Sequence, residues 1–569
     1  MSSAFSRSLV VPSRGASRRS FVVLSALAGL GLPVLAGCDL PGVSKDKGGS
    51  ASPSGSTASA GGSASASAPA QAGSTEWQKL DGHVMGHKVS VEVSPVVRQD
   101  DKSSYIAVKL TRASDDASID AVKASSYKDD SGNKLSISNY LGAGPFRAGT
   151  GASLVKLLDT GSGRVWSAID GSGLFLELAP GEDMTSYLSF GKVDTDTVTV
   201  MVPMAGFTTV SVLDADDAKK AKIDLSIAQA ALKQSSHAVP ELADPVAIER
   251  YTRALDDSTS THAGGKDITV TLASDVTFAS DSADLAPGAE AQLKTVAGQL
   301  GQHPDGGTLT IVGHTDDIQD DAYNQTLSEK RANAVKTRLE QLTKLDKWQT
   351  SVSGKGESEP KVNDTSDEAR AANRRVEITL TPTGGTTPKN TTPAPSSGGG
   401  KLPDPKGPVA KGSDGVTVKS DGGDDHVTIT IDHVTRQGGY LLGQLHTTIS
   451  TTTDTAPDLK QWLTDKEVVF SNSRSEDGSS EPTEHAADGL TLLAGGERIY
   501  PADYRDAGFK THVPLTELQL TPHIKAGTTT VCVVWPDPGG DTITLDHAAP
   551  TKHITDLAFR LTDIPIKNT

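Results

Sequence analysis

The chain is poor in cysteine, in aromatic side chains and in long apolar runs. Its 569 residues include 2 cysteines and 4% aromatic residues, but 56 glycines and 30 prolines. This composition predicts folded modules separated by flexible linkers rather than one large core. The length favours about three folded units.

Dense clusters of basic residues are also missing. The formal net charge is −17, and residues 1–37 contain four arginines and no acidic residue. Removing that segment would take the charge to about −21 (−17 minus 4). A chain this acidic is unsuited to bind nucleic acid through its phosphates, so we expect no nucleic-acid partner.

The N-terminal segment resembles a bacterial export signal. "SRRSFVVLSALAGLGLPVLAGC" has basic residues, then a short apolar stretch, then small residues. "SRRSF" at Ser17–Phe21 resembles a twin-arginine signal, although the general secretory route accepts such sequences too. "LAGC" at Leu35–Cys38 resembles a lipobox, which implies that Cys38 is diacylated and anchored to membrane lipid. Ordinary secretion with an unmodified Cys38 is the alternative.

The second cysteine, Cys532, lies in the apolar, strand-like run "TTTVCVVW". We expect it to be a small buried side chain, since an acylated Cys38 would leave it without a disulfide partner.

Composition divides the chain into seven segments. A signal peptide (1–37) and a Ser/Gly/Ala-rich tether that begins with Cys38 (38–75) precede the first folded region. Two all-β regions are predicted, and they flank a helical or irregular connector, a central α/β domain and a Pro/Gly/Thr-rich linker. In order, these five segments are 76–215, 216–264, 265–381, 382–415 and 416–569. Within the connector, "DDAKKAKIDLSIAQAAL" and "PVAIERYTRALDD" are predicted to be helical.

The two all-β regions are similar to each other. "VSVEVSPVVRQD" from Val89 matches "VTITIDHVTRQG" from Val427, and "LLDTGSGRVW" resembles "LLAGGERIY". "DTVTV" at Asp196 likewise resembles "DTITL" at Asp541. Alternating apolar runs between turns predict antiparallel strands, and about seven runs per region favour an immunoglobulin-like sandwich. Either the regions are copies of one unit, or two Thr/Val-rich domains share short patterns by chance. Neither shows a catalytic motif or metal-ligand spacing, and their histidines are scattered.

The central domain alternates strands with helices. Strands are predicted at 267–274, 308–315, 350–356 and "RVEITLTP", and helices after Pro287, at 324–343 and near "SDEARAANR". The prediction is a compact βαβαβαβ unit. Asn324 is predicted to be a helix N-cap.

An arginine interrupts the apolar stripe of the second helix. Leu327, Val335 and Leu339 share a face at 100° per residue, and Arg331 falls near its centre. A half-buried guanidinium needs an anion of matching geometry. Asp316 follows the preceding strand, at the carboxyl edge of the sheet where ligands often bind. The pattern leaves two hypotheses open: an internal Asp316–Arg331 salt bridge, or a clamp in which Arg331 binds a ligand carboxylate and Asp316 an ammonium group.

The residues of this helix carry a family resemblance. Thr315-Asp316, Leu327-Ser328, Arg331-Ala332, Val335 and Leu339 follow the spacing of OmpA-like peptidoglycan-binding domains, which this region resembles over 267–381. "GKGESEP" and "NRRVEITL" agree as well, whereas Ala369 and Lys355 depart from the family pattern away from the clamp.

The resemblance implies noncovalent binding of the diaminopimelate residue in peptidoglycan stem peptides, with Asp316 and Arg331 as the primary contacts. Thr315 and one of Arg374 and Arg375 are expected at the edge of the site. No cofactor, metal site or catalytic residue is predicted, and His314 has no second ligand nearby.

The sequence therefore predicts a lipoprotein on the extracytoplasmic face of a Gram-positive, actinobacterial cell membrane that also binds the wall. The outer regions would bind an envelope protein or act as spacers. Three alternatives stay open: a wall-metabolism enzyme, which lacks a recognisable motif; a motor stator subunit, which would need a transmembrane helix; and an adhesion or signalling lipoprotein.

Overall fold

The computed structural model describes most of the chain after residue 70. The described residues are 71–84, 86–116, 135–136, 152–170, 177–234, 242, 244–279, 281–386, 402–419, 426–450, 463, 486–505, 512–518, 526–548 and 558–569. They belong to one compact unit, Ala64–Thr569. The predictions for the signal peptide, Cys38, most of the tether and much of the second linker lie outside the described residues.

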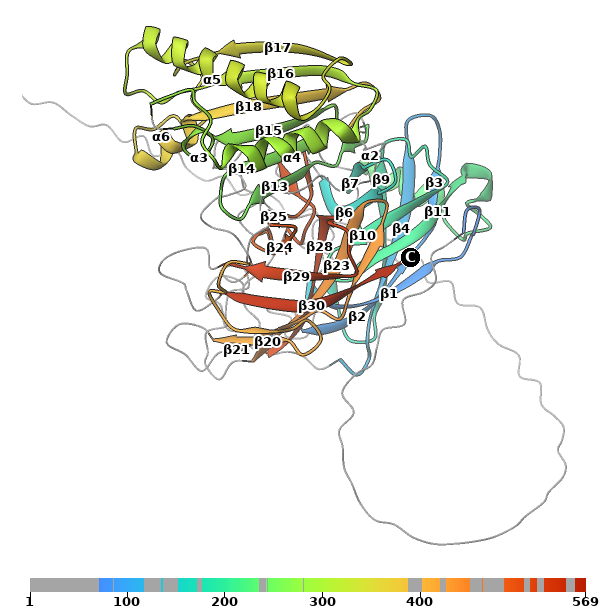
Figure 1. The fold of residues 1–569 in the computed structure, drawn as a ribbon. Coiled ribbons are helices and arrows are strands. Elements are labelled where there is room, and N and C mark those ends of the chain that lie inside the picture. The colour runs from blue at the N-terminus through green and yellow to red at the C-terminus, as the bar shows by residue number, and fades with distance from the viewer. Residues whose placement is uncertain are drawn as a thin grey trace, which may run out of the picture. The chain divides into compact units, whose positions relative to one another are not determined.

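The central domain has a four-stranded sheet in the order β17-β16-β18-β15 (Figure 1). Strands β16 and β17 are parallel, and the β16–β18 and β15–β18 pairs are antiparallel. The strands are β15 (Asp267–Ala273), β16 (Gly307–Gly313), β17 (Trp348–Gly354) and β18 (Arg375–Pro382). The helices are α3 (Ser274–Thr277), α4 (Ala289–Gln302), α5 (Asp321–Leu342) and α6 (Asp367–Asn373). The predicted alternation of strands and helices is thus present, with the short α3 in addition.

The core of this domain lies between the sheet and helices α4 and α5. Ile268, Val270 and Leu272 alternate along β15 and are buried. Val335 and Leu339 of α5 join the same core, and α5 packs on β16 and β17. Period-2 strands and a period-3.6 helix therefore place their apolar faces against each other, as the sequence predicts.

The sheet continues beyond the central domain through the connector. Strand β14 (Thr259–Gly264) pairs with β15, and β13 (Arg250–Ala254) pairs with both β14 and β25 of the C-terminal region. With β12 (Val246–Ala247), these strands replace the helix predicted for "PVAIERYTRALDD", so that prediction was wrong. Strands β14 and β25 provide the backbone hydrogen-bond partners of β13 in this segment, and such tertiary pairing overrides local helix propensity. Helix α2 (Leu225–Gln234) lies in the other segment predicted to be helical.

The first all-β region forms a sheet in the order β1-β2-β4-β3-β11-β10-β6-β7, with β9 paired to β4 and β7. Its strands are β1 (Gln78–Val84), β2 (His87–Val93), β3 (Val96–Arg98), β4 (Ser104–Arg112), β6 (Ala152–Asp159), β7 (Arg164–Asp170), β9 (Asp183–Phe190), β10 (Thr197–Val202) and β11 (Gly206–Asp214). A separate pair is β5 (Leu135–Ser136) and β8 (Glu177–Leu178), and the short 3-10 helix η2 (Ala215–Asp217) follows β11.

The C-terminal region repeats this order as β20-β21-β23-β22-β30-β29-β24-β25, with β28 paired to β23. Its strands are β20 (Val416–Lys419), β21 (His426–Thr430), β22 (Val434–Gln437), β23 (Tyr440–Ser450), β24 (Thr491–Ala494), β25 (Glu497–Ile499), β28 (Ala526–Pro536), β29 (Thr542–His547) and β30 (Phe559–Asn568). Shorter strands are β19 (Val409–Lys411), β26 (Asp503–Tyr504) and β27 (Val513–Pro514).

The two strand orders agree at the positions that the sequence comparison matched. Val96 of β3 pairs in parallel with Val212 of β11, and Val434 of β22 pairs in parallel with Ile566 of β30. Strands β3 and β22 are also antiparallel to the strands that follow them in the chain, β4 and β23. The two regions therefore share one arrangement of strands, whereas the immunoglobulin-like assignment stays a prediction.

Side chains from both all-β regions meet in one buried cluster. Cys532 is fully buried there, and its Sγ lies 3.8 Å from the carbonyl oxygen of Val202. The prediction that Cys532 is a small buried side chain is confirmed, and burial raises the pKa of its thiol. No helix within the described residues is long and apolar enough to cross a membrane.

Candidate functional site

The site lies at the end of β16, where the chain leaves the sheet. Thr315 and Asp316 follow the last residue of the strand, Gly313, by two and three positions. The backbone N–H of His314 donates to the carbonyl of Arg375, and that of Thr315 donates to the carbonyl of Gly356, both at 2.9 Å. The neighbouring strand end and loop therefore fix the direction in which Asp316 leaves the sheet.

Helix α5 begins after Asp320, whose carboxylate accepts a hydrogen bond from the N–H of Tyr323 at 2.9 Å. The prediction that Asn324 is the N-cap was wrong, because the helix starts one turn earlier. Asn324 is instead buried, and its Nδ2 donates to the carbonyls of Asp316 and Gln319 and to Oε2 of Glu357. The side chain joins the Asp316 loop to the helix, so it supports the site as a structural residue.

Arg331 lies on the buried face of α5, as its helical phase predicts. It is 5% exposed, and Asn324, Ser328 and Val335 are buried on the same face. Its Nε donates to the carbonyl of Ser282 at 2.9 Å, and its guanidinium lies 5.2 Å from the ring centroid of Phe278. Burial lowers the pKa of Arg331, and Asp275 and Asp281 oppose that shift. A guanidinium nevertheless keeps its charge at any physiological pH.

Asp316 forms an ion pair with Arg374, not with Arg331. Nη1 of Arg374 lies 2.7 Å from Oδ2 of Asp316, and the same guanidinium makes two contacts with Asp275 through Nε and Nη2. Within the described residues, no carboxylate lies within ion-pair distance of Arg331. The structure therefore contradicts the internal Asp316–Arg331 salt bridge that the sequence allowed as one hypothesis.

Arg374 and Arg375 point to different surroundings, although Arg374 lies at the end of α6 and only Arg375 belongs to β18. Arg374 contacts Asp316, whereas Arg375 is 5% exposed and its Nε lies 2.6 Å from Oε1 of Glu377. His314 is buried near Arg375 and Glu377, and burial lowers its pKa to about 4. Of the two arginines, only Arg374 is thus placed beside Asp316.

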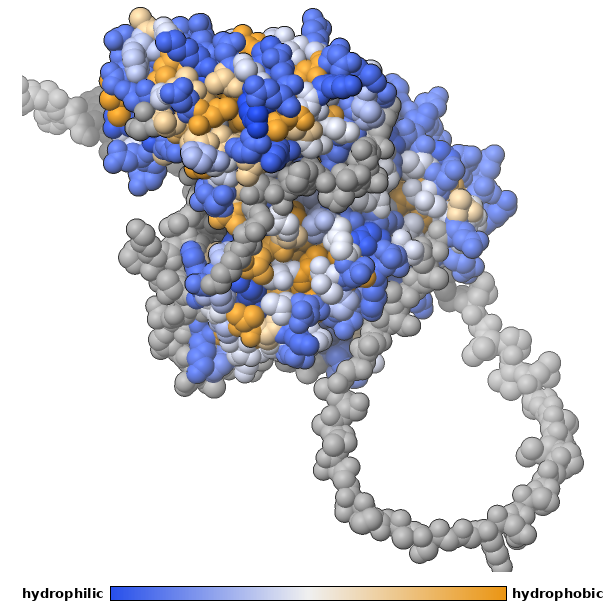
Figure 2. All heavy atoms as spheres, in the orientation of Figure 1, coloured by the Kyte–Doolittle hydropathy of each residue, from blue (hydrophilic) through white to orange (hydrophobic). Residues whose placement is uncertain are grey.

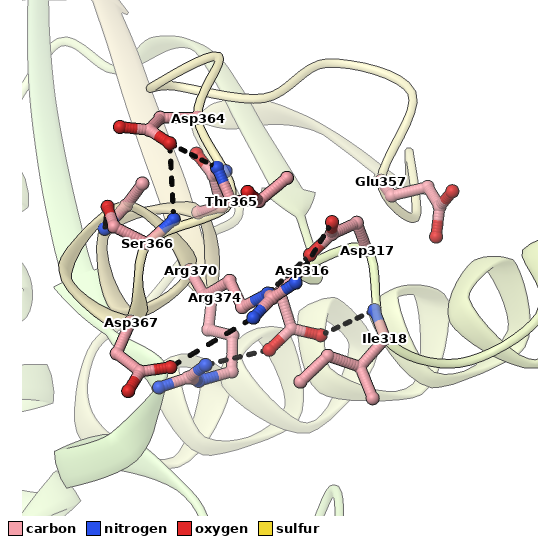
Figure 3. A network of polar contacts seen from close by, with 12 residues as sticks. Asp316, Asp317, Ile318, Glu357, Asp364, Thr365, Ser366, Asp367, Arg370 and Arg374 are labelled. Atoms are coloured by element: carbon pink, nitrogen blue, oxygen red, sulfur yellow. Dashed lines mark hydrogen bonds and ion pairs between the residues drawn. The ribbon is translucent and has the colours of Figure 1, made fainter.

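A cavity of about 430 Å³ opens beside the Asp316 loop. Its lining residues are Thr315, Asp316, Asp317, Glu357, Pro360, Val362, Asn363, Asp364, Thr365 and Asn373. Figure 3 shows the carboxylate of Asp364 accepting hydrogen bonds from the backbone N–H groups of Thr365 and Ser366. It also shows the ion pair between the guanidinium of Arg370 and Asp317. The buried Oγ1 of Thr315 has no hydrogen-bond partner within the described residues. Arg331 does not line this cavity, so the two predicted primary contacts, Asp316 in the loop after β16 and Arg331 on α5, lie in different immediate surroundings.

Apolar side chains are exposed around the same edge. Val276, Ile318 and Tyr323 are 37%, 63% and 39% exposed, and they belong to α3, to the loop after Asp316 and to the first turn of α5. Figure 2 shows apolar side chains among hydrophilic ones over α4 and α5. The charges of Asp316, Asp275 and Arg374 lie in the same part of the domain, and such groups pair with ligand groups of opposite charge.

Sequence reasoning missed Asp275 and Phe278, which surround Arg331 and Arg374. Asp275 lies in the first turn of α3, and Arg374 holds the pKa of its carboxyl below the usual range. The acidic residue near the start of a short helix was the available signal, but its partner lies 99 residues further along the chain.

The fold defines an α/β module, and the comparison with known families says which one it matches. Residues 277–374 match the OmpA family, so this part of the chain is an OmpA C-terminal family domain. The match includes Asp316 and Arg331 and leaves both all-β regions outside.

The curated relatives are similar over the same part of the chain. Outer membrane porin F of Pseudomonas aeruginosa is 41% identical over 103 residues, which cover 18% of this chain and 29% of the porin. Outer membrane protein A of Escherichia coli O157:H7 is 40% identical over 119 residues, covering 19% of this chain and 34% of that protein. The chain thus spans about a third of the length of these relatives.

Solved structures match a similar fraction of this chain. The cell wall anchor of the T6SS from Pseudomonas aeruginosa is 29% identical, with a TM-score of 0.20, and the match covers 22% of this chain and 90% of that one. The peptidoglycan-associated lipoprotein from Burkholderia pseudomallei is 28% identical, with a TM-score of 0.16, and the match covers 20% of this chain and 87% of that one.

Proposed function

We propose that this protein is a membrane-anchored envelope lipoprotein that binds peptidoglycan noncovalently through the diaminopimelate of its stem peptides. Asp316 would bind the ammonium group at the far end of diaminopimelate, and Arg331 would bind the adjacent carboxylate. The outer β regions, which we propose are copies of one sandwich unit, would then lie near the wall and bind an envelope protein.

One observation carries this proposal: the buried guanidinium of Arg331 has no carboxylate partner within the described residues, although it sits on the core-facing side of α5. Burying a charge without a partner destabilises a fold, so such a residue is expected to serve an external anion. A planar guanidinium binds a carboxylate through two parallel hydrogen bonds.

The position of Asp316 supports the second half of the proposed clamp. Its side chain is 11% exposed and lines a cavity large enough for a peptide side chain. Arg374 already neutralises one of its oxygens, Oδ2, at 2.7 Å. A ligand ammonium would approach Oδ1, whose described contact, the N–H of Ile318, is weak at 3.4 Å.

Sedimentation with insoluble peptidoglycan tests the proposal. A soluble form that starts at Asp39 is incubated with diaminopimelate-type peptidoglycan and, separately, with lysine-type peptidoglycan. Lysine has the terminal amine of diaminopimelate but lacks its distal carboxylate. We expect wild-type protein to pellet with the diaminopimelate type, and to bind the lysine type at least about tenfold more weakly, a difference of about 1.4 kcal/mol.

Variants of helix α5 distinguish loss of the proposed ligand contact from a general effect of removing an arginine from this helix. Arg331→Ala should abolish sedimentation, and Arg331→Lys should restore only part of it, because lysine keeps the charge and loses the fork geometry. The matched control is Arg338→Ala, which removes a partly exposed arginine of the same helix that pairs with Glu290. Folded Arg331→Ala and Asp316→Ala proteins that pellet like the wild type would rule out the clamp.

The lipid anchor has its own test. In the native host, we expect labelled fatty acid to be incorporated into the wild-type protein and the protein to fractionate with membranes. Cys38→Ser should lose both properties while the soluble product still binds peptidoglycan. Membrane retention of Cys38→Ser without label would show that the protein is held in another way.

A further inference from the structure

Three side chains that can ligate a metal converge where the connector meets the C-terminal region. Glu249 lies between β12 and β13, His262 lies on β14, and His512 directly precedes β27. One ligand atom from each residue lies within 4.8 Å of the other two. His512 is separated from His262 by 250 positions in the chain, so no local motif in the sequence predicts the cluster.

Both imidazoles point the same ring nitrogen at one carboxylate oxygen. Nε2 of His262 lies 2.5 Å from Oε2 of Glu249, and Nε2 of His512 lies 2.8 Å from the same atom. The two rings meet edge to face, with centroids 5.7 Å apart and an interplanar angle of 86°. The nitrogens and the carboxylate therefore surround a common point instead of forming separate pairs.

The backbone holds the three residues in place. The N–H of Glu249 donates to the carbonyl of Asp503, and the N–H of Asp503 donates back to the carbonyl of Glu249. Asp503 also pairs with Pro514 in the β26–β27 ladder, two residues after His512. His262 is fixed by its pairing with Tyr251 on β13. Ligands placed by strand pairing lose little conformational freedom when an ion binds.

The site also has room and limited access to solvent. A Cβ at Gly264 would lie 2.7 Å from the carboxyl carbon of Glu249, so the absence of a side chain there makes space for the carboxylate. The side chains of His512, Glu249 and His262 are 7%, 16% and 34% exposed. The side of the cluster at His262 is thus the open one, where an ion could enter and keep a water molecule as a further ligand.

We propose that Glu249, His262 and His512 form a binding site for a divalent transition-metal ion of the Zn²⁺ class. Two imidazole nitrogens and one carboxylate oxygen match the ligands that this ion takes in proteins, and the fourth position would be open to water. Ligand distances of about 2.0–2.2 Å require neighbouring ligand atoms to lie about 3.3 Å apart. The two N···O distances must therefore lengthen by less than about 1 Å, which side-chain rotation can supply.

The sequence predicted no metal site, because the three ligands come together only in the folded chain.

An ion at this site would join the β13–β14 hairpin, which extends the sheet of the OmpA-like domain, to the C-terminal β region. The inference goes beyond peptidoglycan binding and does not depend on Asp316 or Arg331. Its chemical consequence is a cross-link that forms in the folded protein and not in the unfolded chain, so binding should stabilise the fold.

Zinc titration of the untagged chain, stripped of metal by chelation, tests the proposal. We expect one zinc ion per chain by elemental analysis after desalting, and a rise in Tm with zinc. Cobalt(II) should give the intense visible absorption of a tetrahedral site with nitrogen and oxygen ligands. His262→Ala and His512→Ala should each weaken zinc binding by more than about 100-fold, since loss of outer-shell partners alone costs 10- to 100-fold.

Two variants control for folding and for adventitious binding. His433→Ala removes a histidine of the same region that pairs with Asp432, and it should bind zinc like the wild type. Glu249→Gln keeps the size of the side chain, and the folded variant should lose the zinc-dependent rise in Tm, whatever its Tm without zinc. Wild-type protein that retains no zinc, or cluster variants that retain as much as His433→Ala, would overturn the proposal and leave a carboxylate hydrogen-bonded by two imidazoles.

Discussion

The carboxylate of Asp316 is paired with Arg374 at 2.7 Å, while Arg331, fifteen residues after Asp316, has no carboxylate partner within the described part of the chain. Arg374 in turn makes two contacts with Asp275, at 2.8 and 2.7 Å. Asp275 and Asp316 therefore share one arginine, Arg374, whereas the described contacts of Arg331 are with the carbonyl of Ser282 and the ring of Phe278. Two carboxylates and one guanidinium leave this group with one net negative charge, which suits a cationic ligand group near Asp316.

The pairing of Arg374 with two carboxylates predicts that alanine substitutions at Arg374 and at Arg331 affect peptidoglycan binding differently. Arg374→Ala removes a neighbour of Asp316 and leaves the proposed ligand contacts in place, so sedimentation with peptidoglycan should weaken by less than about tenfold. Arg331→Ala should abolish sedimentation under the same conditions. If a folded Arg374→Ala protein fails to pellet, then Arg374 itself contacts the ligand and its role has been assigned wrongly.

Asp275 should contribute stability that depends on pH. Arg374 lowers the pKa of Asp275 below its ordinary value of 3.8, so the carboxylate stabilises the fold above that pH and the effect disappears as pH falls through the lowered pKa. Asp275→Asn should therefore cost stability at pH 7 and little in strong acid. The loss should stay below about 1 kcal/mol, because the side chain is 53% exposed. Denaturant unfolding of both proteins across this range measures the difference, and a loss that persists unchanged in acid would contradict the assignment.

Substitution by alanine should lower the stability of the OmpA-like domain at Gly313 and raise it at Gly301. A Cβ at Gly313 would collide with the backbone carbonyl of Ser328, which lies on α5 above the end of β16. Gly313→Ala should therefore destabilise the OmpA-like domain by about 1–3 kcal/mol or more and weaken peptidoglycan binding.

Gly301 is the matched control, since it lies in α4 and a Cβ there meets no atom within 4 Å. Gly301→Ala should leave binding unchanged and stabilise the domain by up to about 1 kcal/mol, because alanine favours the helix. Thermal unfolding of the two variants checks both signs. Equal effects would mean that α5 does not pack on β16 as closely as the structure shows.

Glu517 should make the fold less stable at high pH. Its side chain is fully buried between the two β regions, where Oε2 accepts a hydrogen bond from the N–H of Met204 at 2.9 Å. Burial raises the pKa of Glu517 from 4.5 to about 7. For a raised pKa, the favourable contribution is complete below pH 4.5 and is lost as pH rises to about 7.

Glu517→Gln removes this ionisation and keeps an oxygen that can accept from Met204. The variant should be up to about 3 kcal/mol more stable than the wild type at pH 8, and the difference should shrink toward pH 5. Melting curves over this range provide the measurement. A difference that does not change with pH would show that the pKa of Glu517 is the same in the folded and unfolded states.

Local patterns predicted the central domain well. Alternation along "DITVTLAS" and the apolar stripe of the second helix place β15 and α5 close to where the structure has them. Residues 245–257 were misassigned because β13, which lies in this segment, forms its backbone pairs with β14 and with β25. No property of that segment alone reveals those distant edges, so local propensity gave the wrong answer.

Spacing along the chain was enough to predict that Arg331 lies on the core-facing side of α5, because helical phase depends on spacing alone. Three arrangements could be known only from the fold: Asp316 pairs with Arg374, Asn324 holds the loop after β16 instead of capping the helix, and Glu249 contacts His262 and His512. These pairings depend on distances between segments that are far apart in the chain, and a linear pattern of residue types does not specify such distances.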